Sequence, residues 1–242
     1  AAGPRVVVLD EADRMLDMGF REDIEKILAA IPAERQTVFF SATISPPIQS
    51  LVRHHSRDAR TVKIEQRVVA GAPLVDQVYY EVRHHAKFDA LSRLIDFFAV
   101  KSGVIFCNTQ HMVDELADAL VARGCSAERL HGGMAQAQRT RVMNGFKKGA
   151  FEFLVATDVA ARGIDVNDLE LVVNYDLPYD AEDYVHRIGR TGRAGAKGLA
   201  ISLADEGLVD KLPAIEKYIG QKVPAQMPGA EMTAEEIGRA HV

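Results

Sequence analysis

The segment VVVLDEAD places three carboxylates, those of Asp10, Glu11 and Asp13, directly after or near the end of a short apolar run. Such a run predicts a buried strand, and the ligands of open parallel sheets gather where strands end. Two adjacent carboxylates at that edge suit nucleotide hydrolysis, in which one carboxylate holds Mg²⁺ and another orients the attacking water. A solvated helix cap is the alternative that this tetrad alone leaves open.

The segment HRIGRTGR, residues 186–193, sets arginines at every third position with two glycines between them. Arginines three apart lie on one side of a helical turn and repel each other unless an anion lies between them. Glycine weakens a helix, so a plain helical role explains the segment poorly. We therefore expect Arg187, Arg190 and Arg193 to meet an anion that arrives from outside their own domain. The planar guanidinium group suits phosphate oxygens.

Two stretches of the chain are basic and free of acid, although the chain has 34 Asp and Glu residues and a net charge of −5. The first stretch, residues 131–151, contains Arg139, Arg141, Lys147 and Lys148. The second, residues 184–198, contains the arginines of HRIGRTGR. These stretches indicate anion sites, one for a nucleic-acid backbone and one for a nucleotide. Solvated basic faces are the alternative.

Small polar residues follow four other apolar runs of the sequence. They are Ser41 and Thr43, Asn108 and Thr109, His131 and Gly132, and Thr157 and Asp158. Taken singly, each group is typical of a helix cap or a turn. The remaining histidines, including the pairs His54-His55 and His84-His85, lack metal-ligand spacing and are interpreted as surface residues.

Composition places the chain among globular proteins, because 48% of its 242 residues are hydrophobic. Only Cys107 and Cys125 occur, without CxxC spacing, which indicates neither a disulfide framework nor a zinc site and fits a reduced, cytoplasmic setting. No apolar run reaches the roughly 20 residues of a membrane span. The start AAGPRVVVLD is unlike a signal peptide, and we expect the chain to be cut from a longer one.

Strands and helices are predicted to alternate along the whole chain. In residues 1–66 the pattern predicts strands at 6–10, 36–43 and 61–66 and helices at 21–31 and 46–55. Residues 67–76, which contain Gly and Pro, are expected to form a linker.

Residues 77–222 form a more complete unit. Its predicted strands are 77–82, 103–108, 127–132, 151–158, 169–176 and 198–204. Its predicted helices are 87–99, 110–124, 137–149, 181–189 and 207–220, with a cap at Asp180 and a kink at Pro213. Alternation of this kind with apolar strands predicts a parallel sheet covered by helices on both faces. Residues 223–242 are expected to be a tail.

Taken together, these segments resemble the DEAD-box ATP-dependent RNA helicases of bacterial type. Six motifs stand in family order: DEAD (10–13), SAT (41–43), VIFCNT (104–109), Gln136 with Arg139, TDVAARGID (157–165) and HRIGRTGR (186–193). The resemblance implies an α/β fold with RecA-like parallel sheets sandwiched by helices. It assigns 1–66 to the second half of the ATP-binding domain and 77–222 to the complete helicase C-terminal domain.

Two departures from the family pattern stand out. Gly133 occupies a position where many relatives carry Asp, which changes little because backbone groups dominate that turn. The phosphate-binding loop GxxxxGK[ST] and the glutamine-containing adenine-recognition segment are both missing from the 242 residues. The resemblance therefore implies a portion of a helicase that is inactive alone.

The resemblance also implies roles for individual residues, with ATP and Mg²⁺ as cofactors. Asp10 would hold Mg²⁺ through water and Glu11 would orient the attacking water. Arg190 and Arg193 would reach the γ-phosphate, and Asp165 would accept a hydrogen bond from the ribose. A network that couples hydrolysis to domain closure would comprise Asp13, Ser41, Thr43, His186 and Arg187.

RNA, single-stranded or duplex, is the implied substrate, read through its backbone. The residues that the resemblance places along it are Asn108, Gly132, Gln136, Arg139, Thr157, Asp158 and Gly163. The implied function is ATP-driven unwinding of RNA duplexes, without a membrane partner. A non-catalytic RNA-binding or adaptor module and a DNA translocase on the same scaffold are the alternatives.

Overall fold

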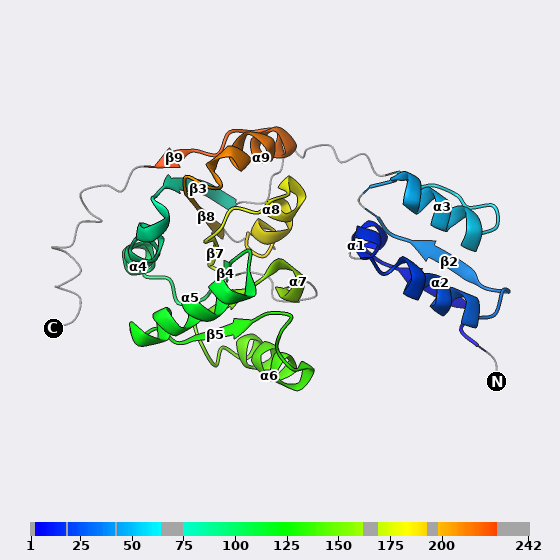
Figure 1. Cartoon of the computed structure of the whole chain (residues 1–242), viewed down its shortest axis with the longest axis horizontal. Coiled ribbons are helices and arrows are strands. Elements are labelled where there is room, and N and C mark those ends of the chain that lie inside the picture. Colours follow the sequence, from blue (N-terminus) through cyan, green and yellow to red (C-terminus); the bar gives the residue numbers. More distant parts are fainter. Residues whose placement is uncertain are drawn as a thin grey trace. The chain divides into compact units, whose positions relative to one another are not determined.

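The computed structural model describes residues 3–17, 19–41, 43–63, 75–161, 169–192 and 198–226. The chain divides into two compact units, Ala1–Glu65 and Gln66–Val242 (Figure 1). Each unit has its own buried apolar core. Among the described residues, no helix is long and apolar enough to cross a membrane.

The first unit is built on two parallel strands, β1 (Val6–Leu9) and β2 (Gln36–Phe39). Three helices accompany them: α1 (Ala12–Asp17), α2 (Arg21–Ala30) and α3 (Pro46–His55). The core consists of Leu9, Ala12, Ile24, Leu28, Ile48 and Leu51. The strand expected at 61–66 is not found over residues 61–63, and its remaining residues lie outside the described ranges.

Local sequence explains the limits of these helices. In α2, Ile24 and Leu28 are one turn apart and both are buried, so they form the inward stripe. The helix stops at Ala30 because Ile31 precedes a proline and adopts an extended conformation. In α3, proline fills the first turn, where a missing N–H costs nothing, and basic side chains fill the last turn, where they favour the helix dipole.

The second unit is built on a seven-stranded sheet in the order β5-β6-β4-β7-β8-β3-β9, and every neighbouring pair is parallel. The strands are β3 (Val75–Glu81), β4 (Gly103–Phe106), β5 (Ala127–Leu130), β6 (Phe153–Ala156), β7 (Leu171–Asn174), β8 (Gly198–Ala204) and β9 (Ala225–Gln226). The predicted parallel α/β sheet is thereby confirmed.

Helices cover both faces of this sheet, as expected (Figure 1). One face packs against α4 (Lys87–Phe98) and α5 (Gln110–Ala122). The other packs against α6 (Gln136–Lys147), α7 (Asp158–Ala161), α8 (Ala181–Ile188) and α9 (Leu212–Ile219). Alternate residues of one strand supply both cores: Ile105 faces the first set of helices, and Val104 and Phe106 face the second.

Four expectations about this unit are wrong in detail. Val75 and Asp76, expected in the linker 67–76, are the first residues of β3. Pro213 lies in the first turn of α9 and does not kink it, because the 3₁₀ turn η2 (Val209–Lys211) ends just before. Asp180 occupies the position before α8 but its side chain makes no capping hydrogen bond. Residues 225 and 226, expected in the tail, pair with β3, and the hydroxyl of Tyr80 donates to Gln226 at 2.7 Å.

Candidate functional site

The carboxylates of the DEAD segment differ in their surroundings. Asp10 and Glu11 are exposed at the end of β1, and a carboxylate oxygen of Asp10 accepts the backbone N–H of Glu11 at 3.0 Å. Glu11 has a φ of 50°, in the left-handed region that residues with a Cβ avoid. Strained backbone of this kind clusters at functional sites. The turn therefore aims these two carboxylates into solvent at the sheet edge.

Asp13, by contrast, is buried and joined to the segment after β2. Its Oδ2 accepts the backbone N–H of Thr43 at 2.7 Å and the Thr43 hydroxyl at 3.0 Å, and Ser41 Oγ donates to the carbonyl of Thr43 at 2.7 Å. Burial opposes ionisation of Asp13, but these hydrogen bonds outweigh it and hold its pKa below the ordinary value. The three residues expected to form a polar network in this unit are thus brought together.

In the second unit, polar residues collect where parallel strands end. Asn108 follows β4, Asp158 follows β6, Asp176 follows β7 and Asp205 follows β8. Thr109 caps α5, since its hydroxyl accepts the N–H of Met112 at 3.1 Å. Asn108 and Asp158, which the sequence analysis singled out, therefore lie at the same edge of the sheet.

Arg187, in the last turn of α8, is the centre of this cluster and is only 1% exposed. Its Nε and Nη2 donate to the two carboxylate oxygens of Asp158, both at 2.6 Å. Nη2 also donates to Asn108 Oδ1 at 2.9 Å, and Nη1 donates to the carbonyl of Asp176 at 2.6 Å and to Asn174 Oδ1 at 3.2 Å. One side chain thus ties together the ends of β4, β6 and β7.

This geometry corrects the expectation that all three arginines of HRIGRTGR meet an anion from outside. The anion of Arg187 is Asp158 of the same unit, 29 residues away in sequence. Spacing alone could not reveal it, because the basic stretch 184–198 contains no acid. Arg190 lines a small hollow together with Phe106, Asp158 and His186. Arg193 lies outside the described residues, as do Asp165 and Gly163.

The residues expected along a nucleic-acid backbone occupy two kinds of position. Gly132 and Gln136 are exposed, and Gln136 Oε1 accepts Arg139 Nη1 at 3.4 Å. Among the described residues, the buried Nε of Arg139 has no hydrogen-bond partner. Asn108 uses its side chain internally, since its Nδ2 donates to the carbonyl of Leu177 at 2.9 Å. Thr157 is buried, and its N–H donates to the carbonyl of Leu130 at 3.2 Å.

His186 is the remaining residue of the expected coupling network. It lies in α8 with its side chain 41% exposed, and its Nε2 is 3.8 Å from Glu182 Oε1. No group of three or more metal-ligating side chains converges within the part of the chain that the structure describes. Asp10 offers the oxygen donor that Mg²⁺ prefers when it is held through water, so the residues fit that ion.

Sequence reasoning missed Lys87, Asp176 and Asp205, which lie beside the cluster. Lys87 is fully buried, and its Nζ donates to Asp176 at 2.7 Å and to Asp205 at 2.8 Å. A signal for the two aspartates existed, because Asp176 ends the predicted strand 169–176, as Asp158 ends 151–158, and Asp205 directly follows the predicted strand 198–204. Lys87 could have been found because it lies one turn before Leu91 on the buried stripe of α4.

Comparison with known families finds two matches along the chain. Residues 2–51 match the DEAD/DEAH box helicase family, and residues 86–195 match the helicase conserved C-terminal domain. The first match lies in the first unit and the second in the second unit.

Among the curated proteins, the chain is similar to bacterial DEAD-box ATP-dependent RNA helicases. The chain is 47% identical over 222 residues to the DEAD-box ATP-dependent RNA helicase CshA of Geobacillus kaustophilus, a match that covers 92% of this chain and 47% of that protein. The chain spans about half the length of the curated relatives it matches.

Two solved structures illustrate the structural likeness. Dbp5 of S. cerevisiae, bound to RNA and ADP BeF3, aligns with a TM-score of 0.82 and 33% identity over 98% of this chain and 63% of that one. The E. coli DEAD-box protein SrmB, bound to regulator of ribonuclease activity A, aligns with a TM-score of 0.61 and 35% identity over 66% of this chain and 95% of that one.

Proposed function

The chain belongs to the DEAD-box RNA helicases, and from this we propose that it is part of an enzyme that couples ATP hydrolysis to the unwinding of RNA duplexes. The observation that carries the proposal is the buried Arg187, which holds the ends of three strands in one polar cluster. A cluster fixed in this way holds in place the strand ends that bear Asn108 and Asp158, two of the proposed RNA contacts.

The proposed chemistry begins in the first unit. Asp10 would hold Mg²⁺ through water, and the bound ion would supply positive charge that neutralises the phosphates. Glu11 orients the attacking water and takes its proton. The left-handed backbone at Glu11 supports this role, because it turns two neighbouring carboxylates outward at the strand end. Asp13, Ser41 and Thr43 hold the two strand ends in register while this happens.

The arginines of the second unit complete the proposed reaction. Arg190 and Arg193 stabilise negative charge on the γ-phosphate, a contribution of about 10³–10⁵ in rate for such arginines in phosphoryl transfer. Asp165 accepts a hydrogen bond from the ribose. Arg187 acts differently from its neighbours, since its guanidinium is already paired with Asp158. His186, on the same turn as Arg187, joins the network that couples hydrolysis to RNA binding.

RNA is the proposed substrate, contacted along its sugar–phosphate backbone without base reading. The basic stretch 131–151, which contains Arg139 and no acid, supports this, because arginine side chains suit phosphate oxygens. The residues proposed to line the RNA are Asn108, Gly132, Gln136, Arg139, Thr157, Asp158 and Gly163. We also propose a cytoplasmic location, which Cys107 and Cys125 support as free thiols.

ATP turnover with and without RNA tests this function. The 242 residues contain no GxxxxGK[ST] loop, so we expect no RNA-stimulated hydrolysis from them alone. A fusion that supplies a segment bearing this loop ahead of residue 1 should hydrolyse ATP when RNA is added, and Arg190→Ala should abolish that activity. Binding of RNA without any turnover in the fusion would favour an adaptor module. Stimulation by DNA alone would favour a DNA translocase.

A further inference from the structure

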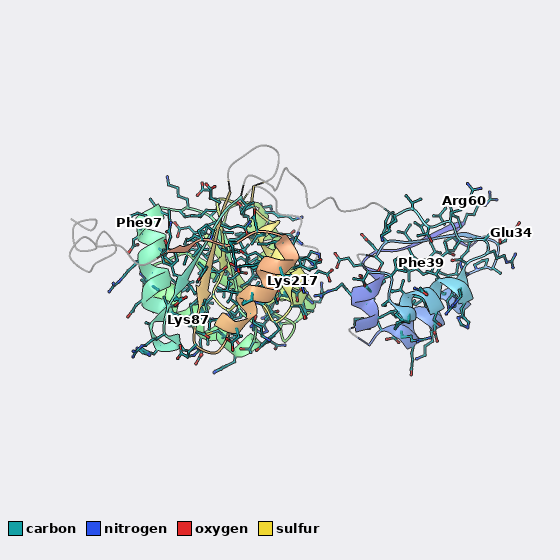
Figure 2. The ribbon with its side chains drawn as sticks, turned by 90° about the horizontal axis from the view of Figure 1, so that it is seen from above. Glu34, Phe39, Arg60, Lys87, Phe97 and Lys217 are labelled. Atoms are coloured by element: carbon teal, nitrogen blue, oxygen red, sulfur yellow. The ribbon has the colours of Figure 1, made fainter. Side chains whose placement is uncertain are left out.

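A fully buried lysine lies at the carboxyl edge of the second sheet and belongs to none of the helicase motifs. Lys87 begins α4, has no exposed surface, and is labelled within the second unit in Figure 2. A buried ammonium group is costly unless it is paired and hydrogen-bonded. Lys87 meets that requirement with Asp176 Oδ1 at 2.7 Å and Asp205 Oδ2 at 2.8 Å, and its Nζ lies 4.8 Å from the ring centre of Tyr175.

Asp176 connects this lysine to the strand end that bears Asn108. While Oδ1 of Asp176 accepts from Lys87, its Oδ2 accepts the backbone N–H of Asn108 at 3.0 Å, beyond the last ladder position of β4. The carbonyl of Asp176 accepts from Arg187 at 2.6 Å. Asp176 therefore accepts hydrogen bonds from Lys87 and Arg187 and also fixes the backbone N–H of Asn108.

Asp205 anchors the other side of Lys87. Its Oδ1 accepts the N–H groups of Gly207 at 2.9 Å and Leu208 at 3.1 Å, so the turn after β8 holds this carboxylate in place. His84 Nδ1 lies 3.3 Å from Asp205 Oδ2, and the N–H of His84 donates to Glu206 at 3.1 Å. The network thus runs without a break from a turn on β8 to the proposed RNA contacts on β4 and β6.

We propose that Lys87 is a positioning residue for RNA binding, which acts through Asp176 to fix the backbone of Asn108 and the start of α5. This inference rests on the proposed function of Asn108 and its neighbours. Without the ammonium group, two buried carboxylates would face each other without a cation between them, and Asp176 would turn away from Asp205. This change weakens its hold on the backbone N–H of Asn108.

The first test is amide hydrogen exchange at Asn108 in the full chain. Lys87→Met should speed exchange at this amide by about tenfold or more, the loss expected for a hydrogen bond to a charged acceptor. Ile215→Ala, a core change in α9 on the opposite face of the sheet, is the control for lost stability and should leave Asn108 exchange unchanged relative to global unfolding. Unchanged exchange in Lys87→Met would overturn the proposal.

The second test is affinity for a fluorescein-labelled single-stranded RNA decamer. We expect about a tenfold loss for Lys87→Met and for Asp176→Asn, and about the same loss for the double variant, because both changes break one path. Multiplied losses, or an equal loss in Ile215→Ala, would overturn the positioning role. Lys87→Gln, which keeps a donor, should lie between wild type and Lys87→Met, and it replaces that variant if the latter does not fold.

The two tests separate this inference from the proposed function. If the wild-type chain binds no RNA, the proposed function fails, while Asn108 exchange in Lys87→Met still decides whether Lys87 positions the strand end. If RNA binds and the exchange does not change, the proposed function stands and the role of Lys87 falls.

Discussion

Arg187 and Asp158 form a two-pronged ion pair in which Nε and Nη2 of the arginine each lie 2.6 Å from a different carboxylate oxygen. The arginine lies in the last turn of α8 and the aspartate begins α7, so the pair joins these two helices. Because Asp158 is neutralised, its carboxylate does not repel a phosphate chain at the end of β6. The pair is thus a condition for the proposed RNA contacts.

Replacing Arg187 by lysine should therefore damage both fold and binding. Lysine offers one ammonium group where arginine offers a fork, so the contacts to Asp158, Asn108 and Asp176 cannot all be kept. We expect Arg187→Lys to lower the free energy of unfolding by about 3–5 kcal/mol, the usual cost of breaking a buried pair. Urea unfolding measures it, with the exposed Lys217→Ala as control (Figure 2). A loss under about 1 kcal/mol would contradict a central role for this side chain.

Gly198 should be intolerant of any side chain. A Cβ at this position would lie under 3.0 Å from Thr191 Oγ1 and from the backbone nitrogen of Gly192, both part of HRIGRTGR. Thr191 is itself fixed, since it is fully buried and its hydroxyl donates to the carbonyl of Leu169. We expect Gly198→Ala to cost about 1–3 kcal/mol of stability, as overpacking does. The control, Gly207→Ala, meets nothing closer than Asp205 Oδ1 at 3.4 Å and should cost less.

The thermal midpoints of these two glycine variants give the comparison. An equal midpoint for Gly198→Ala and wild type would show that the Thr191–Gly192 turn moves without cost. The close approach of Gly198 to Thr191 and Gly192 would then not limit the size of the residue at position 198.

Stability should fall in acid through Asp205. Burial opposes its ionisation, but the hydrogen bond and charge of Lys87, together with His84 and the N–H of Gly207, hold its pKa below the ordinary 3.8. A carboxyl whose pKa is lower in the folded state stabilises the fold above its unfolded pKa and loses that effect as the pH falls through the folded pKa. The free energy of unfolding should thus be level near pH 5–7 and decline below about pH 4.

Asp205→Asn tests this assignment directly. This variant should lower the free energy of unfolding at neutral pH by about 1–3 kcal/mol. The fall of that free energy in acid should be shallower, because the titrating carboxylate is gone. Asp210→Asn, in the neighbouring turn η2, is the control and should leave the decline as in wild type. A profile for Asp205→Asn with the wild-type slope would assign the acid sensitivity to other groups.

Thr43 should control the pKa of Asp13 in the first unit. Thr43→Val keeps the backbone N–H bond to Asp13 Oδ2 but removes the hydroxyl bond at 3.0 Å, so the pKa of Asp13 should rise toward its ordinary value. Thr43→Ser keeps the hydroxyl and should change the pKa of Asp13 little. Titration of Asp13 by carboxyl NMR measures this. A pKa unmoved by Thr43→Val would mean that the hydroxyl does not hold the segment after β2.

The sequence predicted the sheet and its edge better than the contacts at that edge. Short apolar strands and the polar residues after them placed Asn108 and Asp158 at one edge of the sheet, because parallel strands end together. The partner of Arg187 could not be read from spacing, since the carboxylate that neutralises it is distant in sequence. Lys87 was overlooked because a charged residue on a buried stripe was taken as a helix start.

Other differences have equally local causes. The two residues of β9 are too short and too polar to be told from a tail by pattern, and their pairing with β3 depends on Tyr80 reaching Gln226. Pro213 was interpreted as a kink because the turn η2 before it looks helical in sequence. The local sequence does not distinguish a short strand from a tail at residues 225 and 226, or a separate 3₁₀ turn from a kinked helix before Pro213.

The salt dependence of RNA affinity in wild type and Arg139→Ala is the most direct test of whether the second unit binds RNA through its sugar–phosphate backbone. Backbone recognition predicts equal affinity for oligo(U) and oligo(A), weakening as salt rises. For Arg139→Ala it predicts a loss of similar size for both strands and a salt slope smaller by about one, while Lys217→Ala binds as wild type. Affinity confined to one base sequence and lost with Arg139, or a slope that Arg139→Ala leaves unchanged, would contradict backbone recognition by this sheet edge.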